Sequence, residues 1–221
     1  TYALRGVSVV AEAGEVLMVR GPSGSGKTTL LQLMGALKTP NKGRLTICGE
    51  CTEGLSSAAL RDLRLRRIGF VFQFFNLFPT LTAWENVALP LDILGEDAKR
   101  AETRAKDLLA EVGLQDRANH KPNELSGGQR QRVAVARALS NEPKVILADE
   151  PTAALDGANG ELVIKLLRRL AHEKGRIVII VSHDERVEKW VDRAITVEDG
   201  LIVSDARMKR NHARSLVEEL V

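Results

Sequence analysis

Apolar residues occur along the chain in short, β-branched runs that alternate with stretches of helical spacing. Runs of strand length are found at 16–19, 44–48, 68–72, 145–148 and 177–181. Helical spacing predicts helices at 28–37, 57–67 and 98–112, the last with Gly113 as its C-terminal cap. This alternation of strands and helices is typical of an α/β fold.

The second half of the chain predicts a parallel crossover followed by a hairpin. A helix is expected between the strands at 145–148 and 177–181, and such a strand–helix–strand unit is parallel. Its buried face is predicted to consist of Leu162, Val163, Leu166, Leu167 and Leu170. The strand at 194–197, the turn at 198–200 and the strand at 201–203 then form a closing hairpin. We therefore expect a mainly parallel sheet.

About 70 residues of mostly helical pattern separate the strands at 68–72 and 145–148, more than one crossover needs. We interpret them as a helical subdomain, residues 77–140, inserted into an α/β core made of residues 1–76 and 141–221. The 221 residues are thus expected to form a single domain.

Composition narrows the possible environments and partners of the chain. Its longest apolar run, Ile177 to Val181, is far shorter than a bilayer span, and Glu12 and Glu15 interrupt any secretory signal. A cytoplasmic location is therefore expected. The 32 basic and 29 acidic residues leave a net charge of +3, so no nucleic-acid binding is predicted. The tail at 206–221 is predicted to be a surface helix.

The chain has two cysteines, Cys48 and Cys51, in C-x-x-C spacing. One such pair supplies only two metal ligands, and two cysteines exclude a disulfide framework. We interpret the spacing as coincidental.

A phosphate-binding loop is indicated where the strand at 16–19 meets the helix that follows it. The segment Gly21, Pro22, Ser23, Gly24, Ser25, Gly26, Lys27 and Thr28 matches G-x-x-x-x-G-K-[ST]. Its glycines let backbone N–H groups surround a polyphosphate, and the helix start adds its positive dipole end. Lys27 is expected to reach the β and γ phosphates, and the hydroxyl of Thr28 to bind Mg²⁺.

Two adjacent carboxylates follow the strand at 145–148. Asp149 is expected to complete the Mg²⁺ shell opposite Thr28. Because adjacent side chains diverge, Glu150 is expected near the γ phosphate, where it polarises an attacking water as general base. The predicted reaction is hydrolysis of a nucleoside triphosphate.

A second anion site is indicated at 125–129, where L-S-G-G-Q precedes a predicted helix at 130–139. Ser126, Gly127, Gly128 and Gln129 would form an exposed helix N-terminus, which suits a phosphate group. One chain thus carries two phosphate-facing helix starts.

At this point the chain resembles the ABC ATPases, the nucleotide-binding subunits or domains of ABC transporters. Motifs follow in that family's order: Walker A at 21–28, Gln73, the signature at 125–129, Walker B at 145–150, Ala153-Ala154-Leu155-Asp156, and His183. The resemblance implies a P-loop NTPase (RecA-like) core with an N-terminal antiparallel β portion and an inserted helical subdomain. It also implies that the ligands are ATP and Mg²⁺.

By the same resemblance, two copies form a head-to-tail homodimer in which Walker A of one copy and the signature of the other enclose each ATP. Gln73 would contact Mg²⁺ and the attacking water, His183 the γ phosphate, and Asp156 would cross the dimer interface. Thr29 is included with the nucleotide-contacting residues. The family stacks an aromatic residue on adenine, and whether Tyr2 does so stays open.

All five phenylalanines lie between Phe70 and Phe78. Phe70 and Phe72 are predicted to belong to the core. Phe74, Phe75 and Phe78 follow Gln73 in the segment that, by the resemblance, receives a helix of an integral membrane permease. They are predicted to form an apolar docking surface, with a core position as the alternative. The chain would then lie on the cytoplasmic face of the membrane through the permease.

The segments 74–90 and 118–125 look most like ATPase subunits of the lipoprotein-release and macrolide-exporter group. ATPases of polar amino-acid importers share part of the first segment and are the alternative. A soluble ABC ATPase of iron–sulfur assembly would also have a compatible length. A generic P-loop GTPase or kinase predicts neither the signature nor His183.

Overall fold

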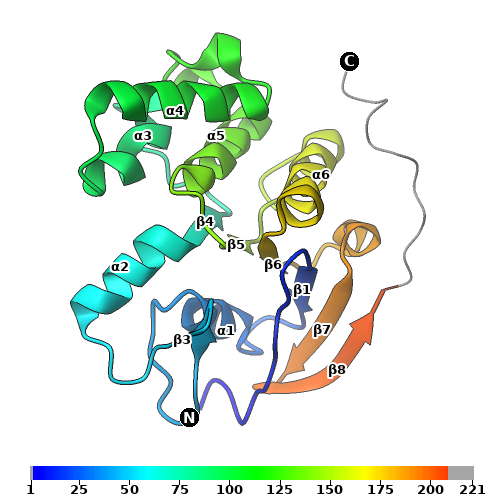
Figure 1. Ribbon diagram of the computed structural model, residues 1–221. Helices are drawn as coiled ribbons and strands as arrows, with labels where there is room; N and C mark the ends of the chain where they lie inside the picture. Colours follow the sequence, from blue (N-terminus) through cyan, green and yellow to red (C-terminus); the bar gives the residue numbers. More distant parts are fainter. Residues whose placement is uncertain (1, 209–221) are drawn as a thin grey trace.

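Parallel strands, with one antiparallel strand at the edge, form the main sheet of the computed structural model, which describes residues 2–208 (Figure 1). The strand order is β4-β5-β6-β1-β7-β8, and only the β7–β8 pair of this sheet is antiparallel. The strands are β1 Val16–Arg20, β4 Ile68–Phe72, β5 Val145–Asp149, β6 Ile177–Val181, β7 Arg193–Glu198 and β8 Leu201–Arg207. The α/β fold with a mainly parallel sheet is thus confirmed.

Helices cover both faces of this sheet and one end of the molecule. They are α1 Lys27–Met34, α2 Ser57–Arg67, α3 Ala83–Ile93, α4 Ala98–Glu111, α5 Gly127–Leu139 and α6 Gly157–Lys174. Short 3₁₀ turns are η1 Gln115–Arg117, η2 Pro122–Glu124 and η3 Glu185–Trp190. Helices α3, α4 and α5, which come between β4 and β5 in the chain, gather at the upper end of Figure 1.

The two cores of the molecule follow the period-two alternation of its strands. In β1, Val16 and Met18 pack in one buried cluster with α6 and the helices α3 to α5. The intervening Leu17 and Val19 pack in a second cluster with α1 and α2. A strand whose side chains are buried on both sides reads as a continuous apolar run, which is why these strands were visible in the sequence.

Helix α5 packs closely on the sheet. A Cβ atom added to Gly69 of β4 would lie 2.2 Å from the carbonyl oxygen of Ala138, so only glycine allows this approach. The helix starts with a capping box in which Ser126 and Gln129 satisfy each other's backbone N–H groups. Its N-terminus is therefore fixed by its own sequence, and its last turn by the sheet.

Several predicted element bounds were wrong, each for a local reason. Helix α1 ends at Met34 and not at residue 37, because Gly35 abuts the ring of Phe70 and Ala36 has a left-handed φ of 50°. The strand at 44–48 is reduced to Thr46–Ile47 (β2), which pairs with Glu50–Cys51 (β3) across a left-handed turn.

This small hairpin is the antiparallel feature of the N-terminal part, since residues 2–15 contain no strand. Cys48 and Cys51 are both exposed free thiols. Within residues 2–208, no group of three His, Cys, Asp or Glu side chains is arranged to hold a metal ion.

The buried face of α6 was predicted correctly at Val163, Leu167 and Leu170, whereas Leu166 is only half-buried. Leu162 is 42% exposed, whereas Ile164 is buried with Val163, Leu167 and Leu170. The closing hairpin is longer than predicted, because β8 continues to Arg207 where a helix was expected to begin. The rest of that predicted helix, 209–221, lies outside the described residues. None of the helices within 2–208 has the length and apolar character required to cross a membrane.

Candidate nucleotide site

The phosphate loop, residues 21–28, joins the carboxyl end of β1 to the first turn of α1. Gly21 has a φ of 146°, and a Cβ atom there would lie 2.0 Å from the carbonyl oxygen of Val197. Gly26 has a φ of 106°, and its Cβ atom would lie 2.6 Å from the carbonyl oxygen of Ala3. Both positions therefore require glycine, for conformation and for space.

Lys27 is held over this loop. Its Nζ donates to the carbonyl oxygens of Gly21 and Pro22, at 2.8 Å each. Pro22, Ser23, Gly24 and Thr28 are exposed, while Gly26, Lys27 and Thr29 are half-buried and Ser25 is buried. The loop thus presents a positive charge and a helix start to solvent, as a polyphosphate site needs.

The turn between β7 and β8 is hydrogen-bonded to the phosphate loop. The N–H of Gly200 donates to the carbonyl of Ser25 (3.0 Å), and the N–H of Arg5 donates to the carbonyl of Gly200 (2.7 Å). Residues 3–5 therefore lie against the phosphate loop. The preceding Tyr2 is exposed, and its contact with adenine stays a prediction.

Strands β4, β5 and β6 end at the same edge of the sheet as this loop, and the predicted catalytic residues follow their ends. In the sheet register, Phe72 of β4 faces Asp149 of β5, which faces Val181 of β6. The residues that directly follow these three are Gln73, Glu150 and Ser182. Because parallel strands share one carboxyl edge, residues far apart in the chain meet there.

Asp149 and Glu150 differ in their surroundings. Burial raises the pKa of Asp149, the negative charge of Glu150 raises it further, and Lys27 opposes both effects. Lys27 thus acts on Asp149 electrostatically across the edge of the sheet. Glu150 has a left-handed φ of 47°, which turns the chain sharply after β5. A non-glycine residue persists in this conformation only where its surroundings fix it.

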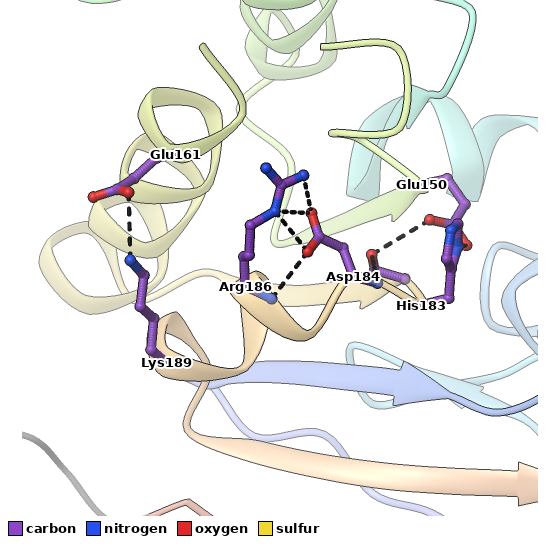
Figure 2. A network of polar contacts seen from close by, with 7 residues as sticks. Glu150, Glu161, His183, Asp184, Arg186 and Lys189 are labelled. Carbon is purple, nitrogen blue, oxygen red and sulfur yellow. Dashed lines mark hydrogen bonds and ion pairs between the residues drawn. The ribbon is translucent and has the colours of Figure 1, made fainter. Parts of the chain in front are cut away.

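The side chain of Glu150 is fixed by the end of β6. His183 Nδ1 donates to Glu150 Oε1 at 2.7 Å, and the hydroxyl of Ser182 donates to Oε2 at 3.3 Å. Figure 2 shows this pair at one end of a polar network that continues through Asp184 and Arg186. The Glu150 side chain is 16% exposed and that of His183 73%. With Nδ1 occupied, the ring presents Nε2 to a further partner.

Ser182 was missed by the sequence analysis. Besides donating to Glu150, its hydroxyl accepts from the N–H of Asp184 at 3.1 Å and so shapes the turn that carries His183. Its position in the sequence could have indicated a role, because it lies between the strand predicted at 177–181 and the predicted site residue His183.

The signature segment, residues 125–129, has different neighbours. A Cβ atom on Gly128 would lie 2.3 Å from Asn159 Oδ1, and Gly127 faces Leu155 and the carbonyl of Ala154. Asp156 caps α6 by accepting from Asn159, which lowers the pKa of Asp156. The signature segment and Asp156 therefore form one group, whereas the phosphate loop packs against residues 3–5, Val197 and Gly200.

The phenylalanine segment is mostly exposed. Phe74 and Phe78 are 71% and 51% exposed, so the core alternative is wrong for both. Phe75 is half-buried, with the Arg130 guanidinium 5.2 Å from its ring centroid. Phe70 and Phe72 are half-buried and stack on each other, with ring centroids 5.8 Å apart.

Arg137 of α5 holds this segment in place. Its guanidinium donates to the carbonyl of Phe75 at 2.8 Å and also to that of Asn76. Both acceptor residues have left-handed backbones, with φ of 61° and 48°. The exposed phenylalanines are thus presented by a fixed turn.

Comparison with known proteins gives concordant matches. The model of the ABC transporter family matches residues 4–153. The lipoprotein-releasing system ATP-binding protein LolD of Porphyromonas gingivalis is 46% identical over 202 residues, covering 91% of this chain and 92% of that protein. The macrolide export ATP-binding/permease protein MacB of a Shewanella species is 47% identical over 204 residues, covering 92% of this chain and 31% of that protein.

A solved structure matches over nearly the whole chain. It is a dimeric post-hydrolysis state of the ATP-binding cassette MJ0796 of Methanocaldococcus jannaschii, bound to ADP and Pi. The TM-score is 0.86 at 44% identity, and the match covers 94% of this chain and 91% of that chain.

Proposed function

Because this chain belongs to the ABC transporter family as an ATP-binding subunit, we propose that it hydrolyses ATP in a head-to-tail homodimer that drives a separate membrane permease. The observation that carries the proposal is the meeting of Lys27, Asp149, Glu150 and His183 at one edge of the sheet. LolD and MacB relatives support a permease of the lipoprotein-release or macrolide-export type, with this chain on its cytoplasmic face.

The residues expected to hold Mg²⁺ fit that ion. Thr28, Gln73 and Asp149 offer hydroxyl, amide and carboxylate oxygens, the ligands that Mg²⁺ prefers. The raised pKa of Asp149 reflects burial beside a second carboxylate, an excess of negative charge that a divalent cation offsets. So few protein ligands are typical of Mg²⁺ sites completed by phosphate and water. When bound, Mg²⁺ would neutralise charge on the β and γ phosphates.

In this proposal Glu150 is the base. Its carboxylate takes the proton of the attacking water, and Gln73 orients that water from the adjacent strand end. His183 donates from Nδ1 to Glu150, and with both ring nitrogens protonated it would also donate from Nε2 to a γ-phosphate oxygen. Lys27 and the N–H groups of residues 21–29 bind the phosphates and stabilise the negative charge that develops on them.

The second half of the proposed site comes from the partner copy. Ser126, Gly127, Gly128 and Gln129 form the N-terminus of α5, which does not share the neighbours of the phosphate loop. Ser126 is exposed there, whereas Gly127 and Gln129 are half-buried and Gly128 is buried. A head-to-tail pair places this N-terminus, with Asp156 beside it, on the ATP of the other copy. Each ATP then links two subunits, and hydrolysis removes the link.

We predict that the Glu150→Gln protein forms a dimer, twice the 24.2 kDa of one chain, when ATP and Mg²⁺ are added. Slow hydrolysis keeps the bridging γ phosphate in place, whereas ADP lacks it and should leave a monomer. Light scattering at increasing protein concentration measures the change. A monomer at saturating ATP and high protein concentration would count against the two-sided site.

A matched pair of variants tests the signature in that dimer. Ser126 and Ser56 are both N-cap residues that accept from an N–H at 3.2 Å, on α5 and α2. Ser126→Arg and Ser56→Arg, each made in the Glu150→Gln protein, should lose similar stability, about 1 kcal/mol. Only Ser126→Arg should abolish the ATP-driven dimer, and equal loss in both variants would reject the role of the signature.

The exposed phenylalanines are the proposed docking surface for the permease. Phe74 and Phe78 project from a turn that Arg137 fixes, directly after Gln73. An apolar surface in this position suits a short helix of a membrane subunit. Attachment there also links the permease to the strand end that bears Gln73.

We predict that the double variant Phe74→Ser and Phe78→Ser loses its permease but keeps basal ATPase activity. Burial of one phenylalanine side chain contributes about 1.5 to 3 kcal/mol, so co-purified permease should fall at least about tenfold. Recovery from detergent-solubilised membranes measures it, with Val203→Ser on exposed β8 as control. Equal recovery from both would reject this surface.

A further inference from the structure

Gln131 is a polar side chain buried in the middle of α5. It is 0% exposed, and its Nε2 donates to the carbonyl oxygen of Pro151 at 2.9 Å and to that of Phe72 at 3.4 Å. These two acceptors are separated by almost 80 positions in the sequence and come from different strand ends. One amide group therefore joins α5 to two segments of the sheet edge.

Both acceptors adjoin residues of the proposed catalytic site. Phe72 is the last residue of β4 and precedes Gln73, while Pro151 follows Glu150. Phe72 also lies opposite Asp149 in the sheet register. Gln131 thus bonds the backbone directly beside Gln73 and Glu150, the two residues proposed to act on the attacking water.

Glu150 occupies a strained conformation that several contacts fix. Its φ of 47° is unfavourable for a non-glycine residue by about 1 to 3 kcal/mol. The turn is held from β6 by the Glu150 N–H bond to Val181 (2.9 Å) and by the side-chain bonds to Ser182 and His183. Within the turn, Ala153 donates to the Glu150 carbonyl at 3.2 Å. Gln131 adds a contact from α5.

The other half of the Gln131 amide argues against a purely stabilising role. Its Oε1 is buried and has no hydrogen-bond partner among residues 2–208. A buried unsatisfied oxygen is destabilising by about 1 to 3 kcal/mol, and an apolar side chain of the same size would avoid that loss. The presence of an amide here is therefore best explained by the two hydrogen bonds that its Nε2 donates.

From these contacts we infer that Gln131 is a positioning residue, which holds the Glu150 turn in its reactive orientation from the signature helix. This inference rests on the proposed role of Glu150 as the base. Gln131 follows Ser126 by five positions on one rigid helix, roughly 7.5 Å along its axis. A shift of the signature on binding ATP is thereby transmitted to the turn that activates the attacking water.

The test compares Gln131→Met with Asn141→Leu. Asn141, just beyond α5, also donates from its side-chain amide to a backbone carbonyl, that of Leu65 at 2.7 Å, and its Oδ1 is also buried without a partner in the described part of the chain. Its acceptor is far from Glu150 in the fold, on α2. The two variants remove the same kind of bond, and only one of them touches the catalytic edge.

We expect Gln131→Met to lower kcat for ATP about 10-fold to 100-fold, because small misplacement of a catalytic group has effects of this size. KM and the dissociation constant of a fluorescent ATP analogue should stay within about twofold, since Gln131 does not touch the phosphate loop. Asn141→Leu should keep kcat within about twofold at a similar melting temperature. An unchanged kcat in folded Gln131→Met would overturn the inference.

A double-mutant cycle separates positioning from general destabilisation. In single-turnover measurements, Gln131→Met should slow the Glu150→Gln protein by less than about twofold, because the group that it positions is already gone. Multiplied effects would overturn the inference. If Gln131→Met does not fold, Gln131→Leu takes its place, because it also removes the amide donor. Failure of both variants to fold would mean that Gln131 acts on stability alone, and would reject the inference. A wild-type protein without ATPase activity would instead reject the proposed function itself.

Discussion

Replacing Glu150 with Gln is expected to slow ATP hydrolysis by about 10²-fold to 10⁴-fold while leaving ATP binding intact. The variant keeps the shape of the side chain, and its amide oxygen can still accept from His183. The NH₂ group that replaces Oε2 cannot accept from Ser182, but it can donate to that hydroxyl instead. It loses the ability to take a proton from water. The expected result is therefore a fall in kcat at an almost unchanged dissociation constant for ATP.

The geometry explains why this carboxylate and not its neighbour carries the effect. Asp149 ends a buried strand, and its pKa is governed by burial, by Glu150 and by Lys27. Glu150 turns away in a left-handed conformation and reaches the end of β6, where His183 directs it. The two adjacent carboxylates thus have different neighbours, which suits the separate roles of metal ligand and base proposed for them.

Steady-state phosphate release and nucleotide binding should be measured on the Glu150→Gln protein beside a Glu173→Gln control. Glu173 is an exposed glutamate in the last turn of α6, so its charge is removed far from the strand ends. The control should retain wild-type turnover. Turnover of Glu150→Gln within about threefold of wild type would remove Glu150 from the role of base.

The strands and the phosphate loop could be predicted because their signals are local. A strand buried on both faces appears as an apolar run, which is how 68–72 and 177–181 were found with their observed bounds. The loop required glycine at positions where a side chain would collide with Val197 or Ala3. Each of these requirements leaves a trace at one place in the sequence.

Side-chain orientation was less predictable because it depends on partners distant in the chain. Leu162 of α6 is as apolar as the buried leucines of that helix, but it lies outside the buried face. This face consists of positions 160, 163, 164, 167, 170 and 171. The contacts of Gln131 with Phe72 and Pro151 span 59 and 20 positions. No periodicity marks such pairs, so only the folded structure reveals them.

Replacing Lys27 with Ala is expected to weaken ATP binding about 10-fold to 100-fold and to reduce hydrolysis below detection. A hydrogen bond to a charged group contributes about 1.5 to 3 kcal/mol, which corresponds to that loss in affinity. Hydrolysis should suffer more, because Lys27 also stabilises the charge that develops on the transferred phosphoryl group.

The ammonium of Lys27 already bonds the carbonyls of Gly21 and Pro22, so its loss also loosens the loop that it covers. Lys38→Ala is the matched control, because Lys38 is exposed beyond the end of α1. This substitution removes the same charge from the same region without touching the phosphate loop. Titration with a fluorescent ATP analogue should separate the two variants by at least about tenfold, whereas ADP should separate them less, because it lacks the γ phosphate that Lys27 is proposed to reach. Equal affinity of both variants for ATP would mean that the phosphates are held by the backbone N–H groups and the helix dipole alone, with no net contribution from the Lys27 charge.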